Sequence, residues 1–537
     1  MNILRYIKTS INSIPRINTS YKYYQWFVLA NIMIGTFMAV LDATIVNVGL
    51  RNMMNSFGTS IDKIEWVLTA YLLIFAVMLP SSGWIADHFG YKRTYFLALS
   101  LFTFGSFLCA LAWNEMILIG FRLIQGIGAG MLMPVGMAIV TREFPPEKRG
   151  IALGFWAISA AASVSLGPMI GGYLIDNFSW HAVFNVNVPV GIIGLLATIV
   201  IQKEYKIQEA RSFDFIGFIS MSIFLGFLLL ALSSGNSSWN TGGWTSNFIL
   251  TCFVFSLIGL IIFFVTEFNV KDPIIDLRLF KNFNFTVTNI ILFIFGFGLF
   301  GSTFLLPYYL QNSLGYTVLQ SGMVFLPVGI LQAFFSLISG FLSDKINPKI
   351  PAFIGIMLLG IGLYLNRFLS LYSENFQIML PLYIRGISLG LIFSPLSTLA
   401  LREIPRDKMA QASGLFNVIR QVGGSFGVSV LGTLLTRQTI YHTAMNGQSV
   451  NQYDAFFQHV IRVIKFPIQN STGKTIGDSI TYSKILIAQN IYNQSFVQAI
   501  CDDFMIAGII TFICVIPLLL IRIHKDKNKT DKIVSME

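Results

Sequence analysis

Long apolar runs recur along the whole chain and constrain its fold more than any other feature. With a window of about 20 residues for one membrane span, they cover 27–50, 64–86, 94–112, 116–141, 151–175, 182–201, 215–232, 248–266, 285–310, 320–342, 351–366, 379–401, 412–435 and 504–521. Only helices and closed barrels satisfy every backbone group in lipid, and runs this long exclude barrel strands. Charged residues make up only 11% of the chain, against about 25% in soluble domains. The sequence therefore predicts an all-α polytopic membrane protein with about 14 transmembrane helices.

Lysine and arginine gather in alternate loops between these runs, as at Lys92 and Arg93, and in both tails. The positive-inside rule then predicts that both termini are cytoplasmic. Topology explains the net charge of +11 without a nucleic-acid partner. The segment 437–503 carries basic residues on the opposite side, but long loops do not obey the rule. We interpret this segment as a small external subdomain.

A repeat at a constant offset of 260 residues relates two parts of the chain. IQGIGAGMLMPVGMAIVTREFPPEKRG, from Ile124, matches IRGISLGLIFSPLSTLALREIPRDKMA, from Ile384, and a weaker match places Asp87 on Asp344. The alignment of charged loop residues argues against a chance likeness of glycine-rich helices. Parallel six-helix repeats with a site near the midplane are the ground plan of one transporter class. The repeat divides the chain into an N-terminal tail (1–26), an N-terminal six-helix bundle (27–201), two additional helices with their loops (202–283), a C-terminal six-helix bundle (284–521, with the external loop 437–503) and a C-terminal tail (522–537).

One acid, Asp42, lies inside the first apolar run, where no other charge occurs. Ionisable groups at bilayer depth are costly and usually face a cavity or a translocation path. Burial disfavours the charged form of a carboxyl group, so Asp42 is predicted to exchange a proton for a lipophilic cation. Thr44 and Asn47 are its expected polar neighbours, and Arg122 is the strongest candidate for a second functional charge. The alternatives are a structural Asp42 paired with Asn47 or an arginine, and an Arg122 that merely reaches toward the membrane surface.

Two further arginines, Arg385 and Arg420, lie in apolar runs. We expect them to hold helices together by binding backbone carbonyls or acids. The substrate cavity is predicted to be apolar and aromatic, because aromatic residues make up 14% of the chain and rings bind lipophilic cations by cation–π contact. The side chains expected to face it are Tyr71, Gln125, Phe155 and Trp156.

A loop motif, GWIADHFGYKR, separates the second and third runs. Glycines there permit close helix approach and a tight turn, and an acid beside two cations can form an ion-pair latch that breaks as the halves move. The alternative is a charge cluster that only sets topology. The predicted gating residues are Gly83, Asp87, Gly90, Lys92 and Arg93.

A second motif, SVSLGPMIGG, lies in the fifth run. Gly167, Gly171 and Gly172 offer small surfaces for close helix packing, and Pro168 removes a hydrogen bond and bends a helix. We interpret these four residues as a hinge, with generic membrane packing as the alternative.

Together with LDATIVNVGL (from Leu41) and RLIQGIGAG (from Arg122), these motifs resemble those of the major facilitator superfamily. The chain is most similar to the fourteen-span drug:proton antiporters of the EmrB/QacA type, although Ser163 replaces the first glycine of the antiporter motif and His88 an arginine of the loop motif. The resemblance implies a protein in the lipid bilayer of the inner (plasma) membrane of a bacterium that exports small hydrophobic, often cationic compounds by alternating access, driven by protons. It also implies a periplasmic adaptor protein, bound at 437–503, and an outer-membrane channel.

Other functions fit the sequence less well. The four cysteines and five histidines are scattered, so no metal site, cofactor or enzyme activity is expected. A passive facilitator would not need a titratable acid, whereas a dedicated exporter or importer of an endogenous metabolite remains an open alternative. Within the external segment, Ile485, Ala488, Ile491, Tyr492 and Phe496 recur at helical spacing and predict a helix that leads into the last span.

Overall fold

The computed structural model describes residues 23–521 apart from 206–211, 213, 238, 406–407, 449, 451–452 and 473–474. Within that part of the chain all regular structure is helical, which confirms the all-α prediction. Fourteen helical segments are long and apolar enough to cross a membrane. The two tails predicted to be cytoplasmic lie almost wholly outside the described residues.

The helices fall into four groups along the chain. The N-terminal half contains α2 (Tyr24–Phe57), α3 (Ile61–Ile64), α4 (Trp66–Phe89), α5 (Tyr91–Ala110), α6 (Glu115–Glu143), α7 (Arg149–Asn177), α8 (His181–Asn185) and α9 (Asn187–Ile201). The two additional spans are α10 (Phe215–Ser234) and α11 (Asn247–Asn269). The C-terminal half contains α12 (Phe283–Asn312), α13 (Val318–Met323), α14 (Leu326–Lys345), α15 (Lys349–Leu365), α16 (Asn375–Leu401), α17 (Met409–Gln448), the last span in α19 (Ile476–Ile513) and α20 (Val515–Leu520). The fourth group is α18 (Ala455–Thr472) and the first part of α19.

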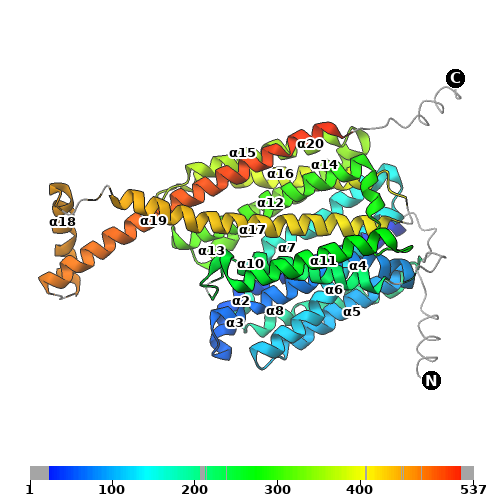
Figure 1. The fold of residues 1–537 in the computed structure, drawn as a ribbon, viewed down its shortest axis with the longest axis horizontal. Helices are drawn as coiled ribbons and strands as arrows, with labels where there is room; N and C mark the ends of the chain where they lie inside the picture. Colours follow the sequence, from blue (N-terminus) through cyan, green and yellow to red (C-terminus); the bar gives the residue numbers. More distant parts are fainter. Residues whose placement is uncertain are drawn as a thin grey trace.

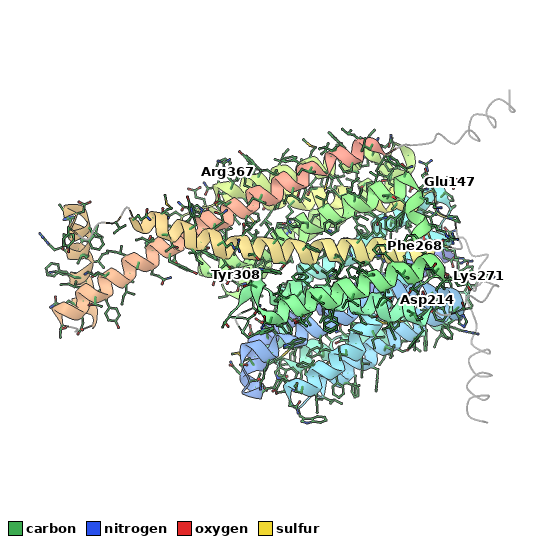
Figure 2. All side chains as sticks on the ribbon, in the orientation of Figure 1. Glu147, Asp214, Phe268, Lys271, Tyr308 and Arg367 are labelled. Atoms are coloured by element: carbon green, nitrogen blue, oxygen red, sulfur yellow. The ribbon has the colours of Figure 1, made fainter. Side chains whose placement is uncertain are left out.

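The spanning helices lie side by side and give the molecule two distinct ends (Figure 1). We call the end where α2 begins and α20 ends the terminal end, and the opposite one the hairpin end. Asp214, Lys271 and Glu147 all lie at the terminal end, whereas Arg367 and Tyr308 lie toward the hairpin end (Figure 2). The charges at Asp214, Lys271 and Glu147 thus mark the ends of helices, as expected for spans that keep their charged residues in water.

The two halves meet along α7 and α14, where glycines let backbones come together. A Cβ atom added to Gly154 would lie only 2.6 Å from the carbonyl oxygen of Ser336. At the terminal end the halves also meet at α4 and α17, where a Cβ on Gly83 would lie 3.0 Å from the backbone nitrogen of Gln411. Such backbone-to-backbone contacts are the usual means of helix association in lipid, where the hydrophobic effect does not drive packing.

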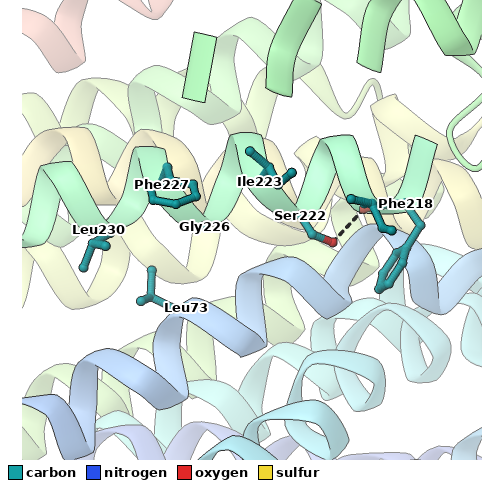
Figure 3. A pocket seen from close by; sticks show the side chains of 8 residues that line it. Leu73, Phe218, Ser222, Ile223, Gly226, Phe227 and Leu230 are labelled. Atoms are coloured by element: carbon teal, nitrogen blue, oxygen red, sulfur yellow. Dashed lines mark hydrogen bonds between the residues drawn. The ribbon is translucent and has the colours of Figure 1, made fainter. Parts of the chain in front are cut away.

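The two additional helices α10 and α11 pack on each other, and α10 also contacts α4 and α17, one helix from each half. Between α10 and α4 lies a groove of about 350 Å³ (Figure 3). Its lining is apolar apart from Ser222, whose hydroxyl donates to the carbonyl of Phe218 over 2.6 Å. The groove holds no charge, so it offers no chemistry for a proton.

At the hairpin end, α17 and α19 continue past the predicted spans. Asn446, near the end of α17, donates to Ser495 of α19 over 2.9 Å, and His442 pairs with Asp502 over 2.8 Å. The part of α19 before Ser495 extends beyond α17 and carries α18 at its tip (Figure 1). At a rise of 1.5 Å per residue this extension is about 30 Å long. The predicted helix in the external segment is confirmed.

Candidate functional site

A buried acid–arginine pair joins α2 to α6 in the N-terminal half. Arg122 Nη1 lies 2.5 Å from Asp42 Oδ2, and both side chains are fully buried, at 0% exposure. The other carboxylate oxygen, Oδ1, accepts hydrogen bonds from Gln125 Nε2 at 2.8 Å and from Asn187 Nδ2 at 3.2 Å. Both oxygens of Asp42 therefore have partners, as a charged carboxylate in a low-dielectric interior requires.

The guanidinium of Arg122 is held by more than its acid. Its Nε donates to the carbonyl of Val67 over 3.1 Å, and its Cζ lies 3.9 Å from the centroid of the Tyr71 ring. The Tyr71 hydroxyl in turn donates to the carbonyl of Ala39 over 3.1 Å. Stacking on the ring adds a cation–π contact. Complete burial excludes the alternative in which Arg122 reaches toward the membrane surface.

Asn187 is a site residue that the sequence analysis missed. It begins α9 and donates to both Asp42 and the hydroxyl of Ser106 of α5, each over 3.2 Å. An amide at the start of an apolar run was the available signal, but nothing local to it shows that it meets an acid 145 residues earlier.

The other predicted neighbours of the acid point elsewhere. Thr44 donates to the carbonyl of Leu41 over 2.9 Å, and Asn47 to that of Ala43 over 3.3 Å. The pairing of Asp42 with Asn47 that was considered from sequence is therefore wrong for this structure, because the acid pairs with an arginine. Each carbonyl belongs to the residue's own helix, so both side chains are satisfied locally.

The four residues predicted to line the cavity lie in three separate environments. Tyr71 and Gln125 belong to the acid–arginine network. Trp156 donates to the Thr36 hydroxyl over 2.9 Å, and its ring lies 5.5 Å from that of Phe393 in the opposite half. Phe155 instead packs edge-on against Trp26 within the N-terminal half. Trp156 is thus the one predicted aromatic with a described ring contact across the two halves.

The gating motif lies at the terminal end. Gly83 has the close contact with α17 described above, and Gly90 has a φ of 98°, a conformation that favours glycine. Asp87 accepts a hydrogen bond from the Tyr91 hydroxyl at 2.9 Å. Lys92 donates to the carbonyl of Ile199 at 2.7 Å, and Arg93 lies 3.5 Å from Glu204.

The expected latch between Asp87 and its own loop cations is therefore corrected. Lys92 and Arg93 lie in the first turn of α5, just after Gly90. From there Lys92 reaches α9 and Arg93 reaches Glu204 in the segment that follows α9. Partial burial raises the pKa of the Glu204 carboxyl above its ordinary value, although Lys92 and Arg93 oppose the shift. The cations of this motif thus fasten elements within one half.

Asp344, the repeat counterpart of Asp87, makes a contact that crosses between the halves. Its two oxygens accept hydrogen bonds from the backbone nitrogens of Gly150 at 2.8 Å and Ile151 at 2.9 Å. These nitrogens lie in the first turn of α7, where a carboxylate is stabilised by the free N–H groups and the helix dipole. Ser394 of α16 donates to the Gly150 carbonyl at 2.9 Å. The start of α7 is thereby fixed to two helices of the other half.

The predicted hinge residues all lie in α7, which continues through Pro168 to Asn177. Cβ atoms added to Gly167 and Gly171 would overlap Thr44 and Ile45 of α2, and one on Gly172 would press on Leu319 of α13. Pro168 is the nearest neighbour of Gly322 in α13. The motif therefore packs α7 against a helix of its own half and one of the other, while a hinge movement stays a prediction.

Two helical halves that meet along glycine-lined helices, with a buried acid–arginine pair inside the N-terminal half, are typical of secondary transporters built from repeats. The family model described as the Major Facilitator Superfamily matches residues 32–214 and 209–428. The chain belongs to this superfamily.

Its relatives include multidrug transporters. The multidrug export protein EmrB of Escherichia coli (strain K12) is 30% identical, with 89% of this chain and 92% of the relative covered. The fatty acid resistance protein FarB of Neisseria gonorrhoeae is 30% identical, with 92% of this chain and 95% of the relative covered. The crystal structure of the human organic anion transporter MFSD10 shares the fold, with a TM-score of 0.59 and 12% identity, over 92% of this chain and 99% of that one. The predicted membership of the EmrB type is confirmed.

Proposed function

We propose that the protein is a proton-driven exporter of hydrophobic compounds that works by alternating access. The observation that carries the proposal is the full burial of Asp42 between the guanidinium of Arg122 and the amides of Gln125 and Asn187. An acid at bilayer depth is expensive and marks proton relays and ion pathways in transporters. The names of relatives, multidrug export and fatty acid resistance, support export of hydrophobic molecules.

Coupling follows from competition for one carboxylate. When Asp42 is ionised it binds a cation, and in the structure that cation is Arg122. A proton on Asp42 cancels the attraction and leaves Arg122 charged and buried without its acid, which is strongly unfavourable. Protonation therefore favours a second arrangement of α2 and α6. A lipophilic cation that reached Asp42 would compete with the proton and with Arg122 in the same way.

The proposed orientation places the terminal end in the cytoplasm and the hairpin end outside the inner membrane of a bacterium. The hairpin end also carries the proposed adaptor site. Tyr482, Ile485 and Tyr492 of α19 lie on one helical face, and each is about half exposed. Exposed apolar surface of this kind marks interaction sites. We place a periplasmic adaptor on this face, as part of a path to an outer-membrane channel.

Asp42→Asn tests the coupling. The amide keeps the size of the side chain but cannot carry the proton, so drug-driven proton release from energised vesicles should disappear while the protein still inserts and folds. Asp176→Asn, at an exposed acid near the end of α7, is the matched control and should transport normally. Undiminished antiport in the Asp42 variant would refute the proposal and favour a passive facilitator. Proton-coupled uptake of an endogenous metabolite, with no effect of drugs, would favour a dedicated transporter instead.

A further inference from the structure

The arginines of the C-terminal half differ from Arg122 in that no acid neutralises them. Among the described residues, Arg385 donates only to the carbonyl of Leu299, at 3.2 Å, and to the hydroxyl of Thr303. Arg420 donates, within the described part of the chain, only to Asn417 Oδ1, at 3.4 Å. From the sequence we expect both arginines to bind backbone carbonyls or acids. Arg385 does bind a backbone carbonyl, whereas Arg420 binds a side-chain amide instead.

Both guanidinium groups also keep a buried N–H without an acceptor among the described residues. These are Nη1 of Arg385 and Nε of Arg420; Nη2 of Arg122 also has no acceptor among the described residues, but the charge of Arg122 is paired with Asp42. An unsatisfied donor costs free energy, and a buried charge without a counter-ion costs more. In the C-terminal half neither Arg385 nor Arg420 has an ion-pair partner among the described residues, and the buried acid Asp503 of α19 likewise has no hydrogen-bond partner among them. Unsatisfied donors of this kind call for a partner outside the described chain.

Arg420 lies where a substrate would pass. It is eleven residues after Met409, the first residue of α17, and thus about 16 Å along the helix axis, near the middle of a hydrocarbon core of about 30 Å. Its guanidinium lies 5.5 Å from the ring centroid of Phe393, the ring that meets Trp156 of the other half. Its partner Asn417 also contacts Met137 of α6, at 3.8 Å. Arg420 therefore lies at the contact between the two halves.

Arg385 lies farther toward the hairpin end on the same group of helices. It precedes Phe393 by eight residues on α16, about 12 Å along the axis. At the repeat offset of 260 residues it falls on Gln125, the amide that binds Asp42 in the N-terminal half. The C-terminal half thus has a cation where the N-terminal half has an amide, and that cation meets a threonine hydroxyl instead of an acid.

We propose that Arg420, with Arg385 as a second cation toward the hairpin end, binds the carboxylate of an amphipathic anionic substrate. The planar guanidinium matches a carboxylate. The rings of Phe393, Trp156 and Phe416 are buried against one another in this structure and become the apolar lining of the site when the two halves separate. This inference rests on the proposed export function and adds the substrate class: hydrophobic carboxylates at this site, and not cations.

The test uses three probes with the same ten-carbon chain: decanoate, decyltrimethylammonium and decanol. Saturable binding to the purified full-length protein is measured for each. The native protein should bind decanoate more tightly than decanol. Arg420→Gln should raise the Kd for decanoate at least about tenfold, the equivalent of roughly 1.4 kcal/mol, and change that for decyltrimethylammonium less than about twofold. Arg420→Lys keeps the charge but loses the planar pair of N–H donors, so its Kd for decanoate should lie between those of the native protein and Arg420→Gln.

Arg367→Gln, at an exposed arginine near the hairpin end, is the matched control and should bind all probes normally. Equal losses for anion and cation in Arg420→Gln, or no preference of the native protein for decanoate over decanol, would overturn the inference. If Arg420→Gln does not fold, the inference is tested by the decanoate Kd of Arg420→Lys and by the preference of the native protein for decanoate over decanol. Asp42→Asn separates the two proposals: it should still bind decanoate but lose proton-coupled export, whereas normal export in that variant would refute the coupling and leave the anion site standing.

Discussion

At the scale of single residues, the two halves differ in the partners of their buried arginines: Arg122 pairs with an acid, whereas Arg385 and Arg420 bind neutral acceptors. Asp42 meets a cation and two amides, and every one of these donors comes from another helix. Arg122 meets an acid, a carbonyl and a ring. Such a network is stable only when it is complete, because each member relieves the burial cost of another. A change at one member should therefore be felt in both stability and transport.

Arg122→Ala leaves Asp42 buried without its cation. We expect a loss of roughly 3–5 kcal/mol in the free energy of unfolding, measured as a lower Tm in detergent, together with loss of transport. Arg122→Lys keeps the charge, so it should lose less stability and less transport activity than Arg122→Ala.

The double variant Asp42→Asn, Arg122→Gln separates stability from function. With both charges replaced by amides, the Tm should recover toward that of the native protein, since neither partner is left charged, but proton-driven transport should stay absent. Recovery of transport in this variant would show that the pair is structural only.

At the scale of secondary-structure elements, the terminal end is held by the start of α7. Asp344 of α14 and Ser394 of α16 both bind the first turn of α7, and Gly83 of α4 meets the first turn of α17. These are short polar or backbone contacts between rigid helices. They can break and reform as a unit when the halves rock, which is the expected movement in a transporter built from repeats.

Asp344→Asn should weaken this closure without touching the substrate site. An amide presents one acceptor oxygen and no charge to the two N–H groups of α7, so the closed state loses stabilisation at the helix terminus. We expect turnover to change several-fold while the substrate Kd changes less than about twofold, because a gate acts on exchange between states. Asp87→Asn should behave alike, because Asp87 lies one turn after Gly83, where α4 meets α17 of the other half. A large change in equilibrium binding with normal turnover would instead place either acid at the substrate.

At the scale of the whole molecule, the extension formed by α18 and the first part of α19 is the part that lies outside the bundle of spanning helices. The spanning helices form the two halves and the pair α10 and α11, whereas α18 and the first part of α19 lie outside them (Figure 1). The contacts of Asn446 with Ser495 and of His442 with Asp502 mark where this extension joins the bundle. Beyond them, α18 and α19 pack on each other, and the exposed face of α19 with Tyr482 and Ile485 is the proposed surface for a partner protein.

Deleting 449–491 and joining Gln448 to Tyr492 through a short Gly/Ser linker removes the extension at its base. Export from isolated inner-membrane vesicles should stay normal, while drug resistance of whole cells should fall toward that of a strain without the gene. The substitutions Tyr482→Ser, Ile485→Ser and Tyr492→Ser, made together in the full chain, should reproduce the defect. Resistance that survives both changes would exclude an adaptor site on this face.

The sequence by itself determined the spans, the all-helical class, the repeat and the family, because hydropathy and motif spacing are properties of neighbouring residues. Even the helix before the last span followed from the spacing of Ile485 and Tyr492. Only the tertiary structure decided the partners of each charge. Asn187 reaches Asp42 across 145 residues, Asp344 caps α7, and Arg420 has no acid as a partner among the residues that the structure describes. Such contacts depend on which helix faces meet once the halves have packed.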